Sequence, residues 1–415
     1  MKKSILKLLY FSLLFIFVPI YVHADDDLDE FLSFNDFSEF IEASSNIYEA
    51  PNINARHAIV FDRNSKQPVF CKKETEACKM ASTTKIMTAI VVLEKTNLSD
   101  VVTISAKAAG TGGSRVKLPK NAKVSVEDLL YGLMMKSGND AAVALAEHVG
   151  GSVENFAILM NQKALELHLF STNFVTPHGL DDNKHYTTAL DLAILTDYAL
   201  QNNKFCEIVR TKARTIMINN YPMTLSNTNE LLGNFEGIYG VKTGFTNGAN
   251  RCLVTACKRG DLDIICVVLG CDTKKDRTRD SINLLNYVFN NFSVINVKDI
   301  IIKNFEEWKE LHKNSFVIYK GVSNNLELYL DSQGFLFTHI AVNKSSLNNI
   351  SANIKFEESF EAPLFSNTKI GEIHLCIDSA KYYGVDILNN NSIERKNILN
   401  YLVYIFKNYS LFFSE

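Results

Sequence analysis

The sequence of 415 residues lacks a strong excess of charge, a pair of Cys-x-x-Cys spacings and a His-Glu-x-x-His segment. Its net charge of −3 gives no indication of a nucleic-acid partner. Eight cysteines without paired Cys-x-x-Cys spacings argue against a zinc ribbon. No internal repeat is evident. The composition, 47% hydrophobic and 21% charged, is that of a globular protein long enough for two folded units.

The longest apolar run lies at the N-terminus and is short for a membrane span. Three lysines precede the run from Leu8 to Val22, and Ala24 follows it at a position that a signal peptidase reads. This pattern predicts a secretory signal at residues 1–24 and an exported protein. An uncleaved membrane anchor is the alternative, but a span needs about 20 apolar residues. Cleavage removes three lysines and no acidic residue, which lowers the net charge to about −6.

Export bears on the cysteines because it permits disulfides. Cys71 and Cys78 flank a short polar loop and could form a bridge. Buried thiols on strands are the simpler interpretation for several of the others. These are Cys252, Cys257, Cys266 and Cys376.

The mature chain divides by texture into four segments. Residues 25–52 are acidic and rich in Ser and Asn, which predicts a poorly ordered leader. Residues 53–292 have strand patterns at both ends and helical spacing between, which predicts an α+β domain with a mainly antiparallel sheet. Residues 293–390 read as short strands separated by Asn, Ser and Gly, the pattern of a small all-β sandwich. Residues 391–415 predict an amphipathic helix too polar and too short to cross a bilayer.

The expected secondary structure of the α+β domain can be given by residue range. Strands are predicted at His57–Arg63, Gln67–Cys71, Gly240–Phe245, Arg251–Lys258 and Leu262–Leu269. Helices are predicted at Val126–Lys136, Ala141–Val149, Val153–Glu166 and Arg279–Phe289, and a helix begins near Ser82.

A serine and a lysine three residues apart, Ser82 and Lys85, begin an apolar helical pattern. Residues at this spacing share one helical face. A serine in the first turn lies beside free backbone N–H groups, and a lysine among apolar neighbours loses proton affinity. Such an amine can take the hydroxyl proton and activate the nucleophile. A helix-capping serine with a lysine reaching to solvent explains the pair equally well when it is considered alone.

Two further motifs favour the catalytic interpretation. Ser137-Gly138-Asn139 forms a turn between two helical patterns, in which Ser137 could relay a proton to a leaving amine and Asn139 could hold a substrate carbonyl. Lys242-Thr243-Gly244 lies on a predicted strand, where glycine permits a ligand backbone to approach. Lys242 and Thr243 would supply charge and a hydroxyl for a terminal carboxylate. Each motif alone is weak, since ordinary turn and strand chemistry accounts for it.

The three motifs in this order resemble the signature of the serine penicillin-recognising acyltransferases. The resemblance extends to the D-alanyl-D-alanine carboxypeptidases among the low-molecular-mass penicillin-binding proteins. It covers about residues 54–291, with a β domain and a terminal amphipathic helix after them. The segments that carry it are Gly113-Ser114-Arg115, VEDLLYGLMMKSGNDAAVALAEHVGGSVENF, FVTPHGLDDNKHYTTALDLAIL, GVKTGFT and APLFSNTKIGEIHL.

The resemblance implies a β-lactamase/transpeptidase-like catalytic domain without a cofactor, which acts on peptidoglycan stem peptides and binds β-lactams. Ser82 would attack the D-Ala–D-Ala carbonyl, and Lys85 would serve as the base. The backbone N–H groups of Ser82 and Phe245 would form the oxyanion hole. Arg277 is a further candidate, beside Lys242 and Thr243, for the substrate carboxylate. The terminal helix would attach the exported protein to the membrane surface.

Two segments depart from the family pattern. After GVKTGFT the chain continues with residues 247–252, NGANRC, where Ala-Gly and an aromatic residue are usual, so the turn behind the site is in question. Asn367-Thr368 stand where a turn glycine is common.

Other functions remain as alternatives. A zinc site in residues 178–185 is suggested by His178, Asp181, Asp182 and His185, but the other histidines are scattered and no metal is expected. A β-lactamase would need a further carboxylate for deacylation, and SGN in place of SDN argues against it. An endopeptidase of cross-bridges stays open. A catalytically silent wall-binding protein is disfavoured because all three motifs are intact.

Overall fold

The structure is a computed structural model that describes residues 34–44 and 48–412, so the predicted signal peptide lies outside the described residues. A five-stranded sheet of order β2-β1-β9-β8-β7 organises its N-terminal part, and every neighbouring pair is antiparallel. The strands come from both ends of this part of the sequence, as predicted. Their bounds are β1 (His57–Asp62), β2 (Gln67–Lys72), β7 (Ile238–Thr246), β8 (Asn250–Arg259) and β9 (Leu262–Cys271).

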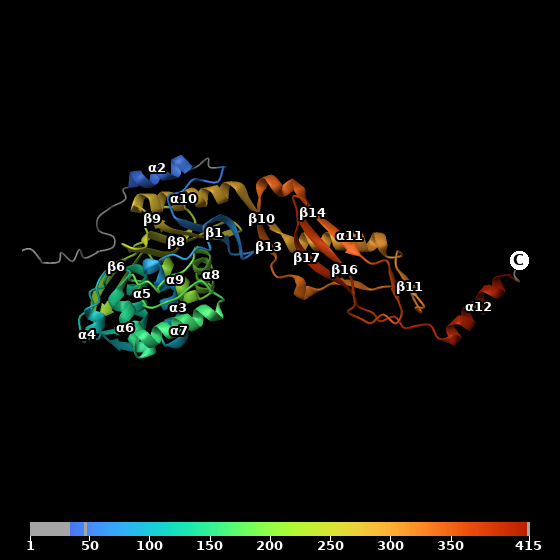
Figure 1. Cartoon of the computed structure of the whole chain (residues 1–415), viewed down its shortest axis with the longest axis horizontal. Helices are drawn as coiled ribbons and strands as arrows, with labels where there is room; N and C mark the ends of the chain where they lie inside the picture. Colours follow the sequence, from blue (N-terminus) through green and yellow to red (C-terminus); the bar gives the residue numbers. More distant parts are fainter. Residues whose placement is uncertain (1–33, 45–47, 413–415) are drawn as a thin grey trace, which may run out of the picture.

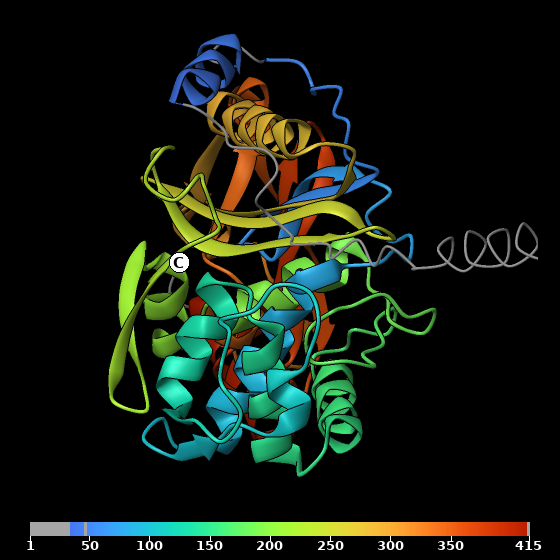
Figure 2. The same cartoon turned by 90° about the vertical axis from the view of Figure 1, so that its left-hand side faces the viewer.

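Helices cover one face of this sheet and enclose the largest hydrophobic cluster (Figure 2). A 3-10 turn, η1 (Ala81–Thr84), leads into α3 (Lys85–Lys95), whose first eight residues are all buried. Around α3 lie α4 (Ala106–Ala109), α5 (Val126–Met135), α6 (Asn139–Gly150), α7 (Val153–Glu166), α8 (Ala189–Ala199) and α9 (Asn203–Arg210). Two small hairpins complete the layer: β3 (Val101–Thr103) with β4 (Lys123–Ser125), and β5 (Ala213–Ile218) with β6 (Tyr221–Ser226).

The opposite face of the sheet is covered by α10 (Lys274–Asn291), and α2 (Phe34–Ser44) packs on the outer side of α10 (Figure 1). The prediction of a poorly ordered leader is therefore wrong for Phe34–Ser44. Phe37 and Phe40 are buried in the hydrophobic cluster on this face. Apolar residues three apart share one side of a helix, so the spacing predicts this packing better than the acidic composition does.

The C-terminal part forms a second, β-rich domain with its own hydrophobic cluster. A four-stranded antiparallel sheet of order β12-β17-β16-β14 is accompanied by the pairs β10-β13 and β11-β15. The strands are β10 (Phe292–Asn296), β11 (Val317–Tyr319), β12 (Leu328–Leu330), β13 (His339–Asn343), β14 (Ile350–Phe356), β15 (Ser359–Glu361), β16 (Lys369–Ile377) and β17 (Ala380–Asn389), with short 3-10 turns η2 (Ser332–Gly334) and η3 (Lys344–Asn349).

This β domain also contains a helix that the strand-like texture did not indicate, α11 (Val297–His312). Its buried residues Val297, Ile301, Phe305 and Trp308 recur every three or four positions and pack in the same cluster as the strands. These residues are spaced to form one apolar face of a helix, and α11 is stabilised because the sheet covers that face. The overall class, an α+β catalytic fold followed by a β domain, agrees with the prediction.

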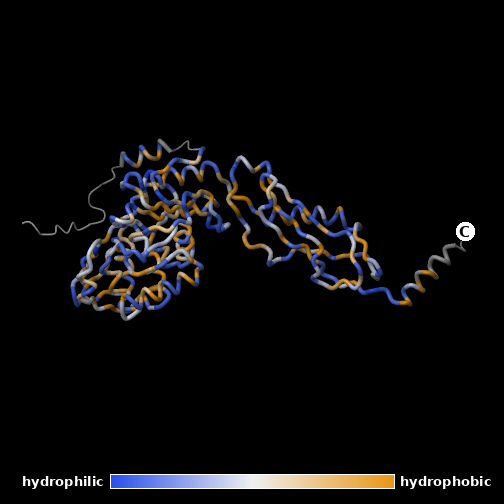
Figure 3. Tube along the Cα trace, viewed as in Figure 1, coloured by the Kyte–Doolittle hydropathy of each residue, from blue (hydrophilic) through white to orange (hydrophobic). Residues whose placement is uncertain are grey.

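The last described element is α12 (Ile398–Phe412), which projects from the far end of the β domain (Figure 1). Hydrophobic residues recur along this helix (Figure 3). The exposed residues are Ile398, Leu399, Leu402, Val403, Ile405 and Phe406. Among the described residues, no helix is long and apolar enough to cross a membrane.

The eight cysteines are all free thiols, so the suggested bridge between Cys71 and Cys78 is not formed. The interpretation of the other four as buried thiols on strands is confirmed. Cys252 and Cys257 lie on β8, Cys266 on β9 and Cys376 on β16, and each is buried.

Candidate active site

Ser82 and Lys85 meet at the junction of η1 and α3, under the edge of strand β7. Lys85 Nζ lies 2.7 Å from Ser82 Oγ. Lys85 has no exposed surface, while Ser82 keeps 5% of its surface accessible. The serine lies in a 3-10 turn, and the α-helix begins at Lys85; the sequence placed both in the α-helix.

Three hydrogen-bond partners surround the amine of Lys85, and they differ in whether they can donate a proton to it. Besides Ser82, the amine contacts Asn139 Oδ1 at 2.8 Å and the backbone oxygen of His178 at 2.9 Å. Those two oxygens can only accept, whereas the hydroxyl of Ser82 can accept or donate. In a neutral amine, two N–H groups satisfy the two oxygens and the lone pair faces the hydroxyl of Ser82. The geometry therefore suits proton transfer from Ser82 to Lys85.

Asn139, the first residue of α6, forms hydrogen bonds to other parts of the protein through both its side chain and its backbone N–H. Its Nδ2 atom donates to the oxygen of Gly112 at 2.7 Å, and its backbone N–H donates to the oxygen of Ser114 at 2.7 Å. Its Oδ1 atom accepts from Lys85. Asn139 thus orients the lysine, and one hydrogen of Nδ2 stays available for the predicted contact with a substrate carbonyl.

The neighbouring Asp140 fixes the loop that faces Asn139. Its carboxylate accepts from the backbone N–H groups of Val116 at 2.9 Å, Lys117 at 2.8 Å and Leu118 at 2.9 Å. Three such bonds hold the loop without a regular element. No sequence pattern marks this role of Asp140, although the residue follows the Ser-Gly-Asn motif directly.

Ser137 has a left-handed backbone conformation, with φ of 59°, and its side chain is buried. Its Oγ atom has no hydrogen-bond partner among the described residues. A buried hydroxyl without a partner costs free energy unless a ligand or water satisfies it. The hydroxyl of Ser137 can therefore accept a partner that the protein does not supply, and its role as a proton relay stays a prediction.

Strand β7 brings the third motif against η1. A Cβ atom at Gly244 would lie 3.0 Å from the backbone nitrogen of Ser82 and 3.2 Å from Ala81 Cβ. Only a residue without a side chain permits this approach. Lys242 and Thr243 are both nearly buried on the same strand. Lys242 Nζ donates to the backbone oxygen of Thr243 at 2.9 Å.

The hydroxyl of Thr243 contacts the hydroxyl of Thr228 at 2.9 Å. Sequence reasoning missed Thr228, because no motif marks it and 15 residues separate the two threonines. Phe245 follows Gly244 on the strand and stacks under the guanidinium of Arg251, with 3.9 Å between Arg251 Cζ and the ring centroid. Phe245 directly follows Gly244, the residue that approaches the backbone of Ser82, and its part in an oxyanion hole stays a prediction.

Arg277 lies on α10 and is buried, with 1% of its surface exposed. Its Nη2 atom contacts Glu230 Oε2 at 3.3 Å, and its Nε and Nη1 atoms have no hydrogen-bond partner among the described residues. Glu230 also forms an ion pair with Lys274. Glu230 lies two residues after Thr228, so this segment connects the arginine to the strand of Thr243. A buried guanidinium with unpaired nitrogens is suited to an anionic ligand.

Residues 178–185, in which the sequence suggested a possible zinc site, lie at the rim of the active site and form hydrogen bonds within the protein. His185 Nδ1 accepts from the N–H of Val175 at 3.0 Å, so Nε2 carries the proton and donates to Thr84 Oγ1 at 2.8 Å. Burial lowers the pKa of His185 to about 4. Burial, with a smaller effect of the charge on Lys85, lowers the pKa of His178 to about 3. Among the described residues, no group of three potential ligands gathers as a metal site.

Asp181, from the same segment, holds the turn between β7 and β8. Its Oδ1 atom accepts from Thr246 Oγ1 at 2.8 Å, and its Oδ2 atom accepts from the N–H of Gly248 at 2.9 Å. Lys79 approaches the carboxylate at 3.7 Å. The unusual residues 247–252 therefore form a fixed turn at 247–249 and the start of β8, and Asp181 supplies the bonds that hold the turn.

A search of protein-family models matches residues 44–273 to Peptidase_S11, described as D-alanyl-D-alanine carboxypeptidase. DacF of Bacillus subtilis, a D-alanyl-D-alanine carboxypeptidase, is 31% identical over 332 residues, 77% of this chain and 81% of that protein. DacA of Haemophilus influenzae is 32% identical over 377 residues, 88% of this chain and 90% of that protein.

Solved structures agree with these relatives. Penicillin binding protein 5 from Haemophilus influenzae superposes with a TM-score of 0.68 at 29% identity, over 84% of this chain and 99% of that one. DacD from Francisella tularensis superposes with a TM-score of 0.69 at 25% identity, over 85% of this chain and 97% of that one.

The antiparallel sheet, the inserted helices and the serine–lysine pair beneath β7 define the class of low-molecular-mass penicillin-binding proteins. Within that class, the chain belongs to the D-alanyl-D-alanine carboxypeptidase family, Peptidase_S11.

Proposed function

We propose that the protein is a serine-type D-Ala-D-Ala carboxypeptidase that removes the terminal D-alanine of peptidoglycan stem peptides. The observation that carries the proposal is the contact of 2.7 Å between Lys85 Nζ and Ser82 Oγ, beneath a strand whose Gly244 approaches the backbone of Ser82. Family membership and relatives named as carboxypeptidases support it.

One set of residues carries out the acyl transfer, and a second set binds the substrate. Ser82 Oγ attacks the carbonyl of the penultimate D-alanine as Lys85 accepts the hydroxyl proton. The backbone N–H groups of Ser82 and Phe245 stabilise the oxyanion. The proton that Lys85 accepted then passes through the hydroxyl of Ser137 to the nitrogen of the departing D-alanine, which leaves the amine of Lys85 neutral again. Lys85 then activates the water that cleaves the ester of Ser82.

The terminal carboxylate of the substrate binds on the N-terminal side of Gly244. Lys242 and Thr243 lie on the strand itself, and Arg277 offers two unpaired nitrogens from α10. Asn139 holds a substrate carbonyl with the remaining hydrogen of its amide. This pairing of a carboxylate with buried cations gives selectivity for a free C-terminus.

The nearest competing function is that of a β-lactamase, which needs a carboxylate to activate water for deacylation. Glu230 near the site pairs with Lys274 and Arg277. Asp140 and Asp181 each accept bonds from neighbouring backbone or hydroxyl groups. These contacts favour structural roles for both residues and a long-lived acyl-enzyme with β-lactams.

Intact-mass spectrometry over time after mixing the mature protein with benzylpenicillin tests the proposal. The expected result is a persistent adduct of one penicillin on Ser82, absent in Ser82→Ala, together with release of D-alanine from an acylated D-Ala-D-Ala peptide. Rapid recovery of the unmodified mass with consumption of the drug would instead identify a β-lactamase. Absence of any adduct and of D-alanine release would refute the active serine.

The same proposal includes export and attachment to the outer face of the membrane. The N-terminal sequence pattern supports export. The exposed apolar residues of α12 support docking of this helix at a lipid surface through burial of those side chains. Cosedimentation of the mature protein with vesicles, compared with a chain that ends at Asn397, tests the attachment.

A further inference from the structure

A cavity of about 500 Å³ lies at the start of strand β7, and it is lined by Arg210, Lys212 and residues 232–239. None of the three motifs contributes to it. The carboxypeptidase function assigned to those motifs does not explain why two cations gather there, so the cavity needs an explanation of its own.

The cavity is separate from the catalytic centre. Val209 is buried and packs on Gly240, where a Cβ atom would lie 2.8 Å from Val209 Cγ2. Gly240 stands between Tyr239, which lines the cavity, and Thr243 of the active site. From Tyr239 to Thr243 the strand advances four residues, roughly 13 Å at about 3.3 Å per residue. A ligand in the cavity is therefore a different group from the peptide bond that Ser82 attacks.

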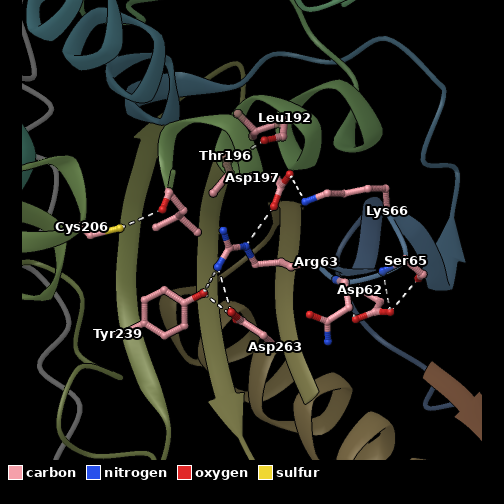
Figure 4. Close-up of polar contacts among 12 residues, drawn as sticks. Asp62, Arg63, Ser65, Lys66, Leu192, Thr196, Asp197, Cys206, Tyr239 and Asp263 are labelled. Atoms are coloured by element: carbon pink, nitrogen blue, oxygen red, sulfur yellow. Dashed lines mark hydrogen bonds and ion pairs between the residues drawn. The ribbon is translucent and has the colours of Figure 1, made fainter. Parts of the chain in front are cut away.

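The aromatic wall of the cavity is held in place from behind. The hydroxyl of Tyr239 donates to Asp263 Oδ1 at 2.6 Å and accepts from Arg63 Nη1 at 3.0 Å (Figure 4). Arg63 also pairs with Asp263 at 2.8 Å and with Asp197 at 3.0 Å. These contacts come from β9, from α8 and from the residue that follows β1, so the ring of Tyr239 keeps a fixed position.

Two cations line the cavity, and neither forms an ion pair within the part of the chain that the structure describes. The guanidinium of Arg210 lies over the ring of Tyr239, with 5.7 Å between Cζ and the centroid. Lys212 Nζ lies against Gly233, where a Cβ atom would collide with it. A fixed ring and a glycine thus set the positions of both charges before a ligand arrives.

The charges around the cavity favour an anion. Glu236 is the acidic residue of the lining. Arg259 adds a third cation beside it, since its Nε atom donates to the backbone oxygen of Glu236 at 3.1 Å and its guanidinium lies 4.5 Å from the ring centroid of Phe235. The whole chain has a net charge of −3, so this local excess of positive charge is where an anionic polymer is attracted. The planar fork of arginine matches a carboxylate.

We propose that this cavity binds the carboxylate of a second stem peptide, carried by the same peptidoglycan strand as the stem in the active site. The proposal rests on the carboxypeptidase function proposed above, and the cavity takes no part in the chemistry. Each uncut stem ends in a free carboxylate, and a polymeric substrate carries many such ends. Binding one stem in the cavity raises the local concentration of the other stems at Ser82, so the enzyme stays on the strand that it trims.

The test compares turnover of a soluble acylated D-Ala-D-Ala peptide with turnover of uncross-linked peptidoglycan strands that bear pentapeptide stems. The variant is Arg210→Gln with Lys212→Gln, both at exposed positions. The matched control is Lys95→Gln with Lys303→Gln, which removes the same charge from exposed positions on α3 and α11. Thermal unfolding checks that each variant is folded.

On the strands, KM of the cavity variant is expected to be roughly fivefold higher than KM of the control, with kcat unchanged, because two exposed ion pairs supply about such a factor. On the soluble peptide, both variants should match the wild type within about twofold, since the cavity lies apart from Ser82. The difference between the variants should disappear in 1 M salt, where charges are screened within about 3 Å. Inorganic phosphate should inhibit turnover of the strands no more than acetate does at the same ionic strength.

Three results would overturn the second stem site while leaving the carboxypeptidase intact. One is an equal KM for the strands in the cavity variant and the control. Another is an equal loss of activity on the soluble peptide, which would place the two cations in the binding of the cleaved stem. The third is selective inhibition of the wild type by phosphate that the cavity variant resists, which would identify a phosphate site instead. If the wild type releases no D-alanine from either substrate and forms no penicillin adduct, the proposed function itself fails.

Discussion

The amine of Lys85 lies 2.7 Å from the hydroxyl oxygen of Ser82, and the lysine has no exposed surface. The two residues are joined by a single turn of chain, yet the distance depends on two further oxygens that hold the amine from other parts of the chain, Asn139 Oδ1 and the backbone oxygen of His178. A lysine held in this way cannot turn to solvent, so its basicity acts on one hydroxyl.

Replacing Lys85 by alanine should slow acylation of Ser82 by benzylpenicillin by roughly 10²- to 10⁴-fold at pH 7, the usual contribution of a general base. The second-order rate constant from time-resolved intact mass measures this. Lys95→Ala, at the other end of α3, should react as the wild type does. Full acylation of Lys85→Ala at neutral pH would show that another group takes the proton.

Gly244→Ala should impair acylation without unfolding the protein. The added Cβ atom lies 3.0 Å from the nitrogen of Ser82 and 3.2 Å from Ala81 Cβ, so strand β7 and η1 must separate. A displacement of a few tenths of an ångström at the oxyanion hole should lower the acylation rate at least tenfold. Gly112→Ala, where a Cβ atom meets nothing within 4 Å, is the matched control. Equal rates in the two variants would contradict the close approach.

Asp181→Asn should loosen the turn that follows the oxyanion strand. The substitution replaces one of two acceptor oxygens, which bind Thr246 Oγ1 and the N–H of Gly248, by a donor. We expect kcat for D-alanine release to fall by about fivefold or more, with KM changed less, because the strand is mispositioned while the carboxylate grip remains. Thr246→Val removes one of the same bonds and should give a smaller effect in the same direction. A change in KM alone would indicate a role in binding.

Stability should fall as the pH is lowered from about 6.5. Burial lowers the pKa of His178 to about 3 and that of His185 to about 4, whereas an unfolded histidine titrates near 6.5. Between these values the unfolded chain binds more protons, so each histidine stabilises the fold above pH 6.5 and loses this contribution on acidification. The lowered pKa of each histidine should reduce the free energy of unfolding by up to about 2 kcal/mol between pH 6.5 and 5.

Urea unfolding at pH 7.0 and 5.0 measures this dependence. His178→Gln and His185→Gln should each flatten it, and His168→Gln, at an exposed position, serves as the control. An unchanged slope in both variants would place the acid sensitivity elsewhere.

Much of the catalytic fold follows from local pattern. Strand β8 and helix α7 were predicted because alternation and helical spacing are properties of a few neighbouring residues. Helices α2 and α11 were missed for a related reason. Their apolar faces, Phe37 with Phe40 and Ile301 with Phe305, sit in polar or strand-like segments, and their helical state depends on the surfaces they cover.

The sequence by itself determined which chemical groups are present and their order, since Ser82 with Lys85 and Lys242 with Thr243 are close along the chain. Only the tertiary structure decided that Gly244 lies against Ser82, that Thr228 contacts Thr243, and that Glu230 reaches Arg277. The physical reason is that such contacts join segments with no local relation, and their distances are set by the packing of a whole sheet against its helices.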